Sequence, residues 1–221
     1  MIDAHAHPSE NRNISHERYI ACCRESDWTV WLSRQTEQLK VGIGIHPWYV
    51  ENERLSIPLL RRHLLSNPDA FVGEIGLDRS RRHKSTYEKQ KKYFAEQLAL
   101  AVELDRPVCI HLVRSYQDGY SLLKMHRCRS VYFHGFLGSV EEARRYPNAF
   151  FGFNRRNIAH PKGIQILKEL SENQILLESD GDSNRDSLEE TLHQIALIRK
   201  KSLHDMEQIV DGNAKRWVAQ S

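Results

Sequence analysis

The chain has 221 residues, a formal net charge of +3, and 40% hydrophobic against 28% charged residues, so it can bury a core and stay soluble. No apolar run approaches about 18 residues and no basic-then-apolar signal opens the chain, which argues against a membrane span and against export. Cys22, Cys23, Cys109 and Cys128 lack Cys-x-x-Cys spacing. We therefore expect reduced thiols in a cytoplasmic protein, not a disulfide framework or a zinc knuckle.

Short apolar runs alternate with amphipathic segments along the chain. The runs lack polar alternation, which indicates strands buried on both faces, as in parallel sheets. Strands are predicted at Ile2–Ala4, Thr29–Leu32, Val41–Ile45, Ala70–Ile75, Pro107–His111, Ser130–His134, Ala149–Phe153 and Gln174–Leu177. Helices are predicted from Ser56 onward and at Ser85–Leu104, Gly163–Glu172, Asp186–Lys201 and His204–Ala219.

Eight strands with intervening helices predict an α/β fold, a TIM-type (β/α)8 barrel, with residues 1–221 forming a single metal-dependent hydrolase domain. The chain is short for this fold, which usually takes about 250 residues. Only Ser33–Lys40 separates the second predicted strand from the third. A full crossover needs about a dozen residues or more, so the barrel is expected to be trimmed around the second βα unit. The alternative, a doubly wound sheet, usually has a glycine-rich nucleotide turn where this chain has histidines.

Six residues of metal-binding type lie at or near the ends of predicted strands. They are His5, His7, Glu74, His111, His134 and Asp180. In barrels the C-terminal strand ends meet at one edge, where active sites lie. His5 and His7 are two residues apart, so they point to the same side of a strand. That pair alone is as often structural as metal-binding, but the six together favour a metal site.

The set contains histidine and carboxylate only, which suits Zn²⁺, Mn²⁺ or Mg²⁺ and selects none of them. Six ligands are too many for one catalytic zinc, which keeps three and an open position. They suit two divalent ions that share a carboxylate, and Glu74 is the predicted bridge. Asp180 is the candidate to orient the attacking water and to accept its proton.

These residues lie within motifs that resemble, in order, those of the TatD family of metal-dependent deoxyribonucleases in the amidohydrolase superfamily. The motifs are His5-Ala-His7, Gly44-Ile-His-Pro-Trp48, Val72-Gly-Glu-Ile-Gly-Leu-Asp78, Pro107-Val-Cys-Ile-His111, His134-Gly-Phe-Leu-Gly-Ser139, Leu176-Leu-Glu-Ser-Asp180 and Gly212-Asn213. The resemblance covers nearly the whole chain. It implies a TIM-type barrel, two divalent ions and cleavage of DNA phosphodiesters in the 3′–5′ exonuclease direction.

The resemblance also implies how the two ions are divided. His5, His7, Glu74 and Asp180 would hold one ion, and Glu74, His111 and His134 would hold the other. The chain departs from the family at Glu178-Ser-Asp-Gly-Asp182, where a small residue and a proline usually follow the aspartate, and at Arg114, which lies three rather than two residues after His111. All six ligands are retained, so the departures concern the substrate rather than the metal site.

Basic residues follow several predicted strands and would face the same edge. Clustered arginines neutralise phosphates and offer paired hydrogen bonds, which points to a DNA or RNA substrate. The predicted substrate-binding residues are His46, Arg79, Arg81, Arg82, Arg114 and Arg155. The basic run at residues 79–84 could equally be a solvated loop. Trp48 either stacks on a base or packs as a lid on the rim.

Two other functions fit the same residues. One is hydrolysis of an ester, lactone or aminoacyl-tRNA bond at the same dinuclear site, because a fold does not fix its substrate. The other is a role as a subunit of a multi-protein complex, since short TatD-like proteins occur in operon-encoded anti-phage systems. Without such a partner, a monomer is expected.

Overall fold

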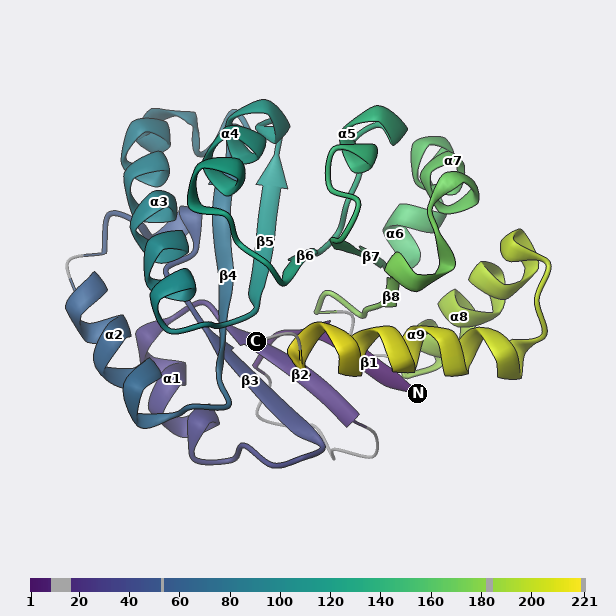
Figure 1. Ribbon diagram of the computed structural model, residues 1–221, viewed down its shortest axis with the longest axis horizontal. Helices are drawn as coiled ribbons and strands as arrows, with labels where there is room; N and C mark the ends of the chain where they lie inside the picture. The colour runs from purple at the N-terminus through teal and green to yellow at the C-terminus, as the bar shows by residue number, and fades with distance from the viewer. Residues whose placement is uncertain (9–16, 53, 182–184, 220–221) are drawn as a thin grey trace.

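The computed structural model describes residues 1–8, 17–52, 54–181 and 185–219 (Figure 1). Eight strands form one sheet in which each strand pairs in parallel with the next strand of the chain. The strands are β1 Ile2–Ala6, β2 Glu17–Cys22, β3 Leu39–Ile43, β4 Phe71–Asp78, β5 Val108–Val113, β6 Val131–Phe133, β7 Phe150–Phe153 and β8 Ile175–Leu177. This sequential order confirms the predicted barrel and excludes a doubly wound sheet, whose strand order reverses at a switch point.

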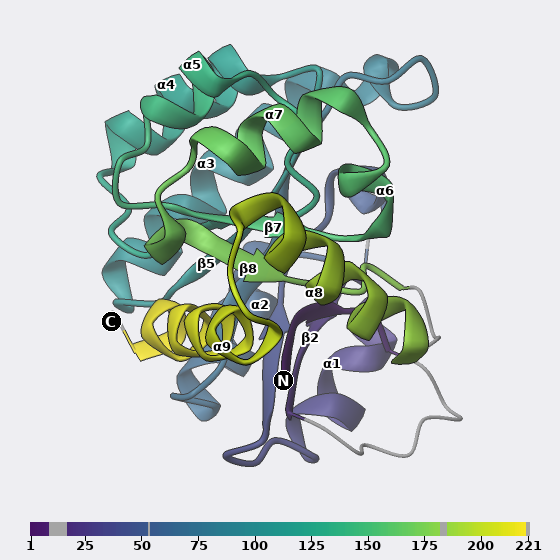
Figure 2. The same ribbon diagram turned by 90° about the vertical axis from the view of Figure 1, so that its right-hand side faces the viewer.

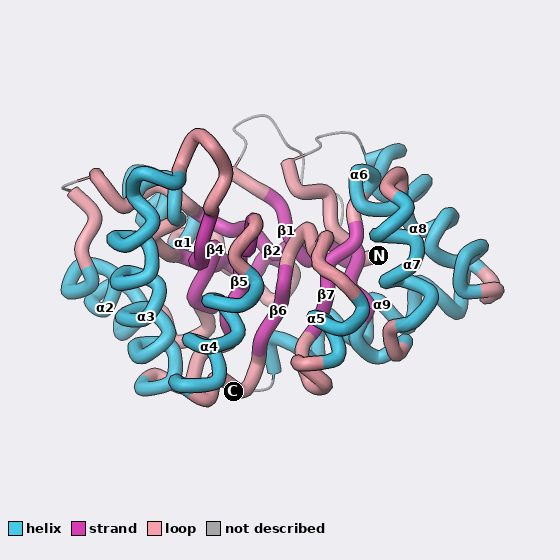
Figure 3. The backbone as a smooth tube through the Cα atoms, turned by 90° about the horizontal axis from the view of Figure 1, so that it is seen from above, coloured by secondary structure: helices cyan, strands magenta, loops and turns pink. Residues whose placement is uncertain are grey.

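Helices surround the strands on the outside, as the view from above shows (Figure 3). They are α1 Glu25–Leu32, α2 Ile57–Ser66, α3 Tyr87–Glu103, α4 Tyr116–His126, α5 Val140–Arg144, α6 Arg155–Ile158, α7 Pro161–Glu169, α8 Arg185–Arg199 and α9 Leu203–Ala219. Three 3-10 turns lie between them, η1 Pro47–Tyr49, η2 Lys84–Thr86 and η3 Glu172–Gln174. The helices predicted from the sequence are therefore confirmed as α2, α3, α7, α8 and α9, with small shifts of their ends.

The predicted strand at Thr29–Leu32 is wrong, because these residues form the second half of helix α1. The second strand is β2, Glu17–Cys22. Trp28, Trp31 and the following leucine are buried at helical spacing, and this face packs α1 onto the sheet. A helix therefore does join β2 to β3. The short connection is instead residues 7–16, between β1 and β2, and residues 9–16 of it lie outside the described part of the chain.

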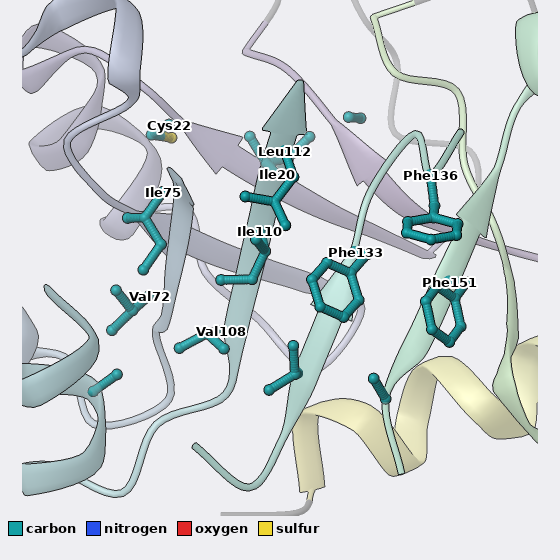
Figure 4. Packing of buried hydrophobic residues seen from close by; sticks show 14 of the residues in the cluster. Ile20, Cys22, Val72, Ile75, Val108, Ile110, Leu112, Phe133, Phe136 and Phe151 are labelled. Atoms are coloured by element: carbon teal, nitrogen blue, oxygen red, sulfur yellow. The ribbon is translucent and has the colours of Figure 1, made fainter. Parts of the chain in front are cut away.

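The side chains of the strands alternate between two cores. One cluster fills the barrel interior and comprises Ile2, Ala4, Tyr19, Phe71, Cys109, Tyr132, Phe150, Leu176, Ala214 and Trp217. The neighbouring strand residues, among them Ile20, Val72 and Ile110, face the helices instead (Figure 4). Alternate residues of a strand point to opposite faces, so each strand serves both cores.

Helix α9 closes the end of the barrel opposite the carboxyl ends of the strands (Figures 1 and 2). Its Trp217 is fully buried and packs against the rings of Tyr132, Phe71 and Tyr19 at centroid distances of 4.8, 5.1 and 6.0 Å. This end is thus plugged by aromatic packing, as expected for the edge of a barrel that serves stability.

The barrel closes where β1 meets β8. Across this seam the backbone N–H of Asp180 donates to the carbonyl of His5 at 3.0 Å, and the N–H of Ser179 donates to Asp3 Oδ1 at 2.9 Å. Other neighbouring strands of the barrel are joined by paired ladders, whereas the described residues form no such ladder between β8 and β1. The barrel is therefore nearly closed, and the residues that seal it are the predicted metal ligands His5 and Asp180 and their neighbours.

Candidate metal centre

The carboxylate of Glu74 lies at the centre of the site. It comes from β4, where the pairing with β5 shifts register between Val72 and Ile75, and it is 1% exposed. Its two oxygens face two different groups of side chains. A buried carboxylate addressed by ligands on both oxygens has the arrangement of a bridge between two cations.

Three imidazoles surround Oε1 of Glu74. His134 Nε2 lies at 2.6 Å, His111 Nδ1 at 2.8 Å and His46 Nε2 at 3.3 Å. The facing nitrogens of His111 and His134 are 3.0 Å from each other. His111 belongs to β5, whereas His134 and His46 follow β6 and β3, so the three come together only because the strand ends meet at one edge.

The surroundings of Oε2 are more open. His5 Nε2 lies at 3.5 Å, Cys23 Sγ at 3.6 Å and His7 Nε2 at 3.8 Å. Asp180 Oδ1 is 3.6 Å from the same nitrogen of His7 and 4.0 Å from that of His5. Most of these distances exceed hydrogen-bonding length and come close to the separation of about 3.3 to 3.6 Å between ligand atoms around one tetrahedral ion.

The buried nitrogen His5 Nε2 supports this interpretation, because it has no hydrogen-bond partner among the described residues. An unpaired polar atom in a protein interior costs free energy unless something satisfies it. A cation beside Oε2 would do so.

The outward ring nitrogens indicate which histidines can offer a lone pair to an ion. The carbonyl of Ala21 can only accept a hydrogen bond, so the proton on His7 lies on Nδ1, 3.3 Å away. In the same way the ionised Asp78 accepts from His111 Nε2 at 3.4 Å. In their neutral forms both rings therefore present a free lone pair toward Glu74.

His46 has the opposite arrangement. Its Nδ1 accepts a hydrogen bond from the backbone N–H of Trp48 at 3.2 Å, so the proton of the neutral ring lies on Nε2 and points at Glu74. A nitrogen that carries a proton cannot bind a metal ion. His46 thus has the geometry of a hydrogen-bond donor in the site.

The site has a field that favours positive charge. Burial opposes ionisation of Glu74, but the imidazoles of His134, His46 and His111 around Oε1 hold its pKa well below the usual range. Burial also disfavours the charged form of His134, but Glu74 outweighs it and raises the pKa of His134 to about 10. Burial lowers the pKa of His5 to about 4. The arrangement attracts a cation, for which protons and metal ions compete.

Asp180 follows β8 and completes the group. Burial opposes its charge, but the neighbouring imidazoles of His7 and His134 lower its pKa to about 2. Its second oxygen, Oδ2, lies 3.5 Å from the guanidinium of the exposed Arg156. Asp180 is therefore ionised and faces both the histidines and the solvent-accessible mouth. Asp182, the acidic residue of the same loop, lies outside the described residues.

Glu178 holds the loops around the site in place, although sequence reasoning gave it no role. Its buried carboxylate accepts hydrogen bonds from the hydroxyl of Tyr132, from the backbone N–H of Gly135 and from Asn154 Nδ2, the last two at 2.8 Å. A Cβ at Gly152 would collide with this carboxylate, so the glycine makes room for it. Burial raises the pKa of Glu178 to about 7. The network fixes the chain just after His134.

A cavity of about 1050 Å³ opens over the metal-ligand cluster. Among the predicted substrate-binding residues, His46 lines it. Arg79 instead folds over the ring of Tyr87, 5.3 Å from its centroid, and Arg155 lies against a separate hollow beside α8. Arg81, Arg82 and Arg114 are exposed and do not line this cavity.

Other basic residues take these places on the cavity wall. They are Arg24, Arg34 and Arg156. Arg24 lies directly before helix α1, and Arg34 lies in the turn after it. The sequence wrongly predicted a strand at Thr29–Leu32, between these two residues. Trp48 is 49% exposed at the rim, and its indole donates to Asp78 Oδ2 at 2.6 Å while it stacks on His83.

Comparison with known proteins supports the fold and the type of site. The family model for TatD related DNase matches residues 2–219. The chain is 34% identical over 139 residues to a putative deoxyribonuclease TATDN1 homolog of Vairimorpha ceranae, covering 62% of this chain and 50% of that protein. It is 30% identical over 164 residues to the uncharacterized metal-dependent hydrolase YabD of Bacillus subtilis, covering 66% and 63%. The chain thus spans about half to two thirds of the length of these relatives.

Two solved structures share the fold. The TatD homologue YJJV from Escherichia coli superimposes with a TM-score of 0.80 at 23% identity, covering 90% of this chain and 84% of that one. A TatD family hydrolase from Entamoeba histolytica superimposes with a TM-score of 0.82 at 16% identity, covering 100% and 98%. The agreement extends over nearly the whole barrel, including the strand ends that carry the site.

Proposed function

Because this chain belongs to the TatD family of related DNases, we propose that it is a dinuclear metal-dependent hydrolase that cleaves DNA phosphodiesters, in the 3′–5′ exonuclease direction. The observation that carries the proposal is the carboxylate of Glu74, with ligand-type atoms gathered separately around each of its oxygens. A site built on one side of a carboxylate would serve one ion. A site built on both sides serves two.

The residues present fit two divalent ions. On the Oε2 side, His5, His7 and Asp180 join Glu74, and the unpaired His5 Nε2 points into this space. On the Oε1 side, His111 and His134 join it. The first ion would have four protein ligands and the second three, which leaves the second with a position open for water or substrate. The ligand atoms are carboxylate oxygens and imidazole nitrogens, which are hard to borderline bases of the kind that Mg²⁺, Mn²⁺ and Zn²⁺ prefer.

Divalent ions held there would supply the Lewis acidity that activates water and neutralises a phosphate. The residues of the chain do the rest. Asp180 is ionised and accepts a hydrogen bond or proton from the attacking water. His46 donates its Nε2 proton to a phosphate oxygen at the cluster. Arg156, 3.5 Å from Asp180, offers positive charge at the mouth of the cavity, where the DNA strand would enter.

The DNA strand would lie along the cavity wall. Arg24 and Arg34 extend the positive charge from the metal cluster along α1, and the exposed Trp48 offers an aromatic face for a base. Arg79, Arg81, Arg82, Arg114 and Arg155 stay predictions for contacts farther along the strand. Hydrolysis of another bond at the same site is a less favoured function, because a lactone or ester does not need the arginines of the wall.

A protein partner and a cytoplasmic location stay predictions from the sequence. In the described part of the chain, no helix has the length and apolar character required to cross a bilayer.

The test is to measure metal content and DNA cleavage together in the wild type, Glu74→Ala and Glu88→Ala. Glu88 is the control, because its side chain is 85% exposed on α3. We expect about two ions per chain in the wild type and control, with sharp loss of metal and of cleavage in Glu74→Ala. Metal without cleavage of any labelled strand would contradict the nuclease proposal and keep the metal site. Cleavage that survives in Glu74→Ala would contradict the site.

A further inference from the structure

A thiol lies among the oxygen and nitrogen atoms of the metal cluster. Cys23 Sγ is 3.6 Å from Glu74 Oε2 and 4.0 Å from His7 Nδ1. His7, Cys23 and Glu74 form one of the groups whose ligand atoms all lie within 4.8 Å of one another. No charge pattern or spacing in the sequence marks this residue, because its strand was predicted in the wrong place.

The alternation of β2 aims Cys23 at the site. Tyr19 belongs to the core inside the barrel, and residues 21 and 23 follow it at the two-residue spacing that keeps the same face. The adjacent Cys22 belongs to the outer core and faces the helices. Of these two neighbouring cysteines, the first is therefore a packing residue and the second reaches the barrel interior, just past the carboxyl end of the strand.

The environment of Cys23 differs from that of a cysteine used for packing. Buried free cysteines usually behave as small apolar side chains and contact apolar neighbours. Cys23 is half-buried on the cavity wall and faces a carboxylate and an imidazole. Its 3.6 Å distance to Oε2 falls within the range of about 3.1 to 3.8 Å expected between a sulfur and an oxygen bound to one zinc ion.

An independent observation supports a cation in the same space. His5 Nε2 is fully buried, has no hydrogen-bond partner among the described residues, and lies 3.5 Å from the same Oε2. The nitrogen and the sulfur thus face one carboxylate oxygen from two different strands, β1 and β2. The nitrogen has no hydrogen-bond partner among the described residues, and the sulfur makes only long contacts of 3.6 to 4.0 Å with Glu74, His7 and Ala21.

We propose that the Cys23 thiolate is a ligand of the ion held on the Oε2 side of Glu74, and that it makes this position selective for zinc over magnesium and manganese. The inference rests on the proposed dinuclear metal site and adds to its histidine and carboxylate ligands. On binding, the thiol releases its proton to solvent as the metal–sulfur bond forms. Thiolates favour zinc, whereas magnesium and manganese favour oxygen ligands, so one sulfur changes the preference of this position alone.

The test is cobalt substitution followed by absorption spectroscopy on the wild type, Cys23→Ser and Cys128→Ser. Cys128 is a matched control, because it is also half-buried and lies at the opposite end of the barrel. We expect visible ligand-field bands in all three proteins. We expect a near-ultraviolet thiolate-to-cobalt charge-transfer band in the wild type and in Cys128→Ser, and its loss in Cys23→Ser. Zinc affinity should fall by about tenfold or more in Cys23→Ser, with manganese affinity unchanged.

The outcomes separate this inference from the proposed function. Ligand-field bands without a charge-transfer band in the wild type would overturn the thiolate ligand and leave the metal site intact. Persistence of the band in Cys23→Ser would do the same. The absence of any bound cobalt or zinc in the wild type would overturn both.

A second measurement uses the wild type alone and covers the case in which Cys23→Ser does not fold. Alkylation by iodoacetamide, mapped by mass spectrometry, should be slowed at Cys23 by zinc and unchanged at Cys128. Equal labelling of Cys23 with and without zinc, in protein shown to hold the metal, would overturn the inference.

Discussion

Replacing His46 by alanine tests whether this residue is a proton donor or a metal ligand. The contacts of its two ring nitrogens indicate that it is a proton donor. Nδ1 accepts from the backbone N–H of Trp48 at 3.2 Å, and Nε2 lies 3.3 Å from Glu74 Oε1. The comparison variant is His111→Ala. Nδ1 of His111 lies 2.8 Å from the same oxygen of Glu74, but its other nitrogen, Nε2, donates to Asp78, so Nδ1 is free to bind a metal ion.

The expected magnitudes follow from these contacts. Loss of one donor aimed at developing negative charge costs about 10²- to 10³-fold in turnover, or about 2.7–4 kcal/mol. The N–H of Trp48 loses its partner as well, which costs about 1 kcal/mol of stability and lowers the melting temperature by about 2–4 °C for a chain of this size. His46→Ala should keep both ions. His111→Ala should lose metal from the Oε1 side and lose activity with it.

The assay is elemental analysis of each variant after dialysis, with DNA cleavage measured on the same samples at saturating metal. Loss of an ion from His46→Ala would refute the assignment of its proton to Nε2. Turnover that stays near the wild-type value would refute its role as a donor. Retention of both ions in His111→Ala would show that the ligand set itself is wrong.

Four further results are expected. Removing metal with a chelator should lower the melting temperature by about 5–10 °C, because an ion at a hundred times its Kd stabilises by about 2.7 kcal/mol, and added metal should restore it in calorimetry. Trp48→Phe removes the hydrogen bond to Asp78 and should weaken metal binding by about 10- to 100-fold in titration calorimetry, without loss of helix content. Phe133→Ala, at a 1% exposed position, should cost about 3–5 kcal/mol in urea unfolding, and a cost near zero would contradict the outer core. Ser139→Ala removes the cap on Glu142 N–H and should cost about 0.5–2 kcal/mol by the same method.

The sequence predicted the barrel and the convergence of the six candidate ligands because both follow from the strands. The apolar runs predicted as strands at Ala70–Ile75, Pro107–His111 and Ser130–His134 carry Glu74, His111 and His134 at their last or next-to-last position. Since strands of one barrel end at one edge, the position of each residue along its own strand was sufficient to predict the cluster. The same reasoning applied to His5 and to Asp180.

The second strand was missed for a physical reason. Glu17–Cys22 begins with charged and aromatic residues, whereas Thr29–Leu32 is a short run of β-branched and apolar ones. Short apolar runs do not distinguish a strand from the buried face of a helix. The tertiary contacts of Trp28 and Trp31 decide in favour of a helix here, and with the strand in the wrong place Cys23 was missed too.

Loop side chains were the least predictable part of the site. Their direction depends on local backbone and on neighbours that no strand period describes. Arg79 lies on Tyr87 and away from the cavity, while Arg156, next to the predicted Arg155, reaches Asp180. A displacement of one residue in a helix turns a side chain by about 100°, so charge near a strand end predicts an electrostatic surface better than it predicts an individual contact.

The seam between β1 and β8 has a consequence for how the protein is made. His5 and Asp180 lie near opposite ends of the sequence, and their backbones are hydrogen-bonded to each other. Chains grow from the N-terminus and fold as they emerge, so His5 of β1 is synthesised long before the strand β8 with which it is finally joined. A nascent chain that has not yet formed β8 carries His5, His7, Glu74, His111 and His134 without Asp180, the sixth candidate ligand. Under the proposed function, hydrolysis requires the completed seam, and we expect a ribosome-bound fragment that lacks β8 to be inert toward DNA.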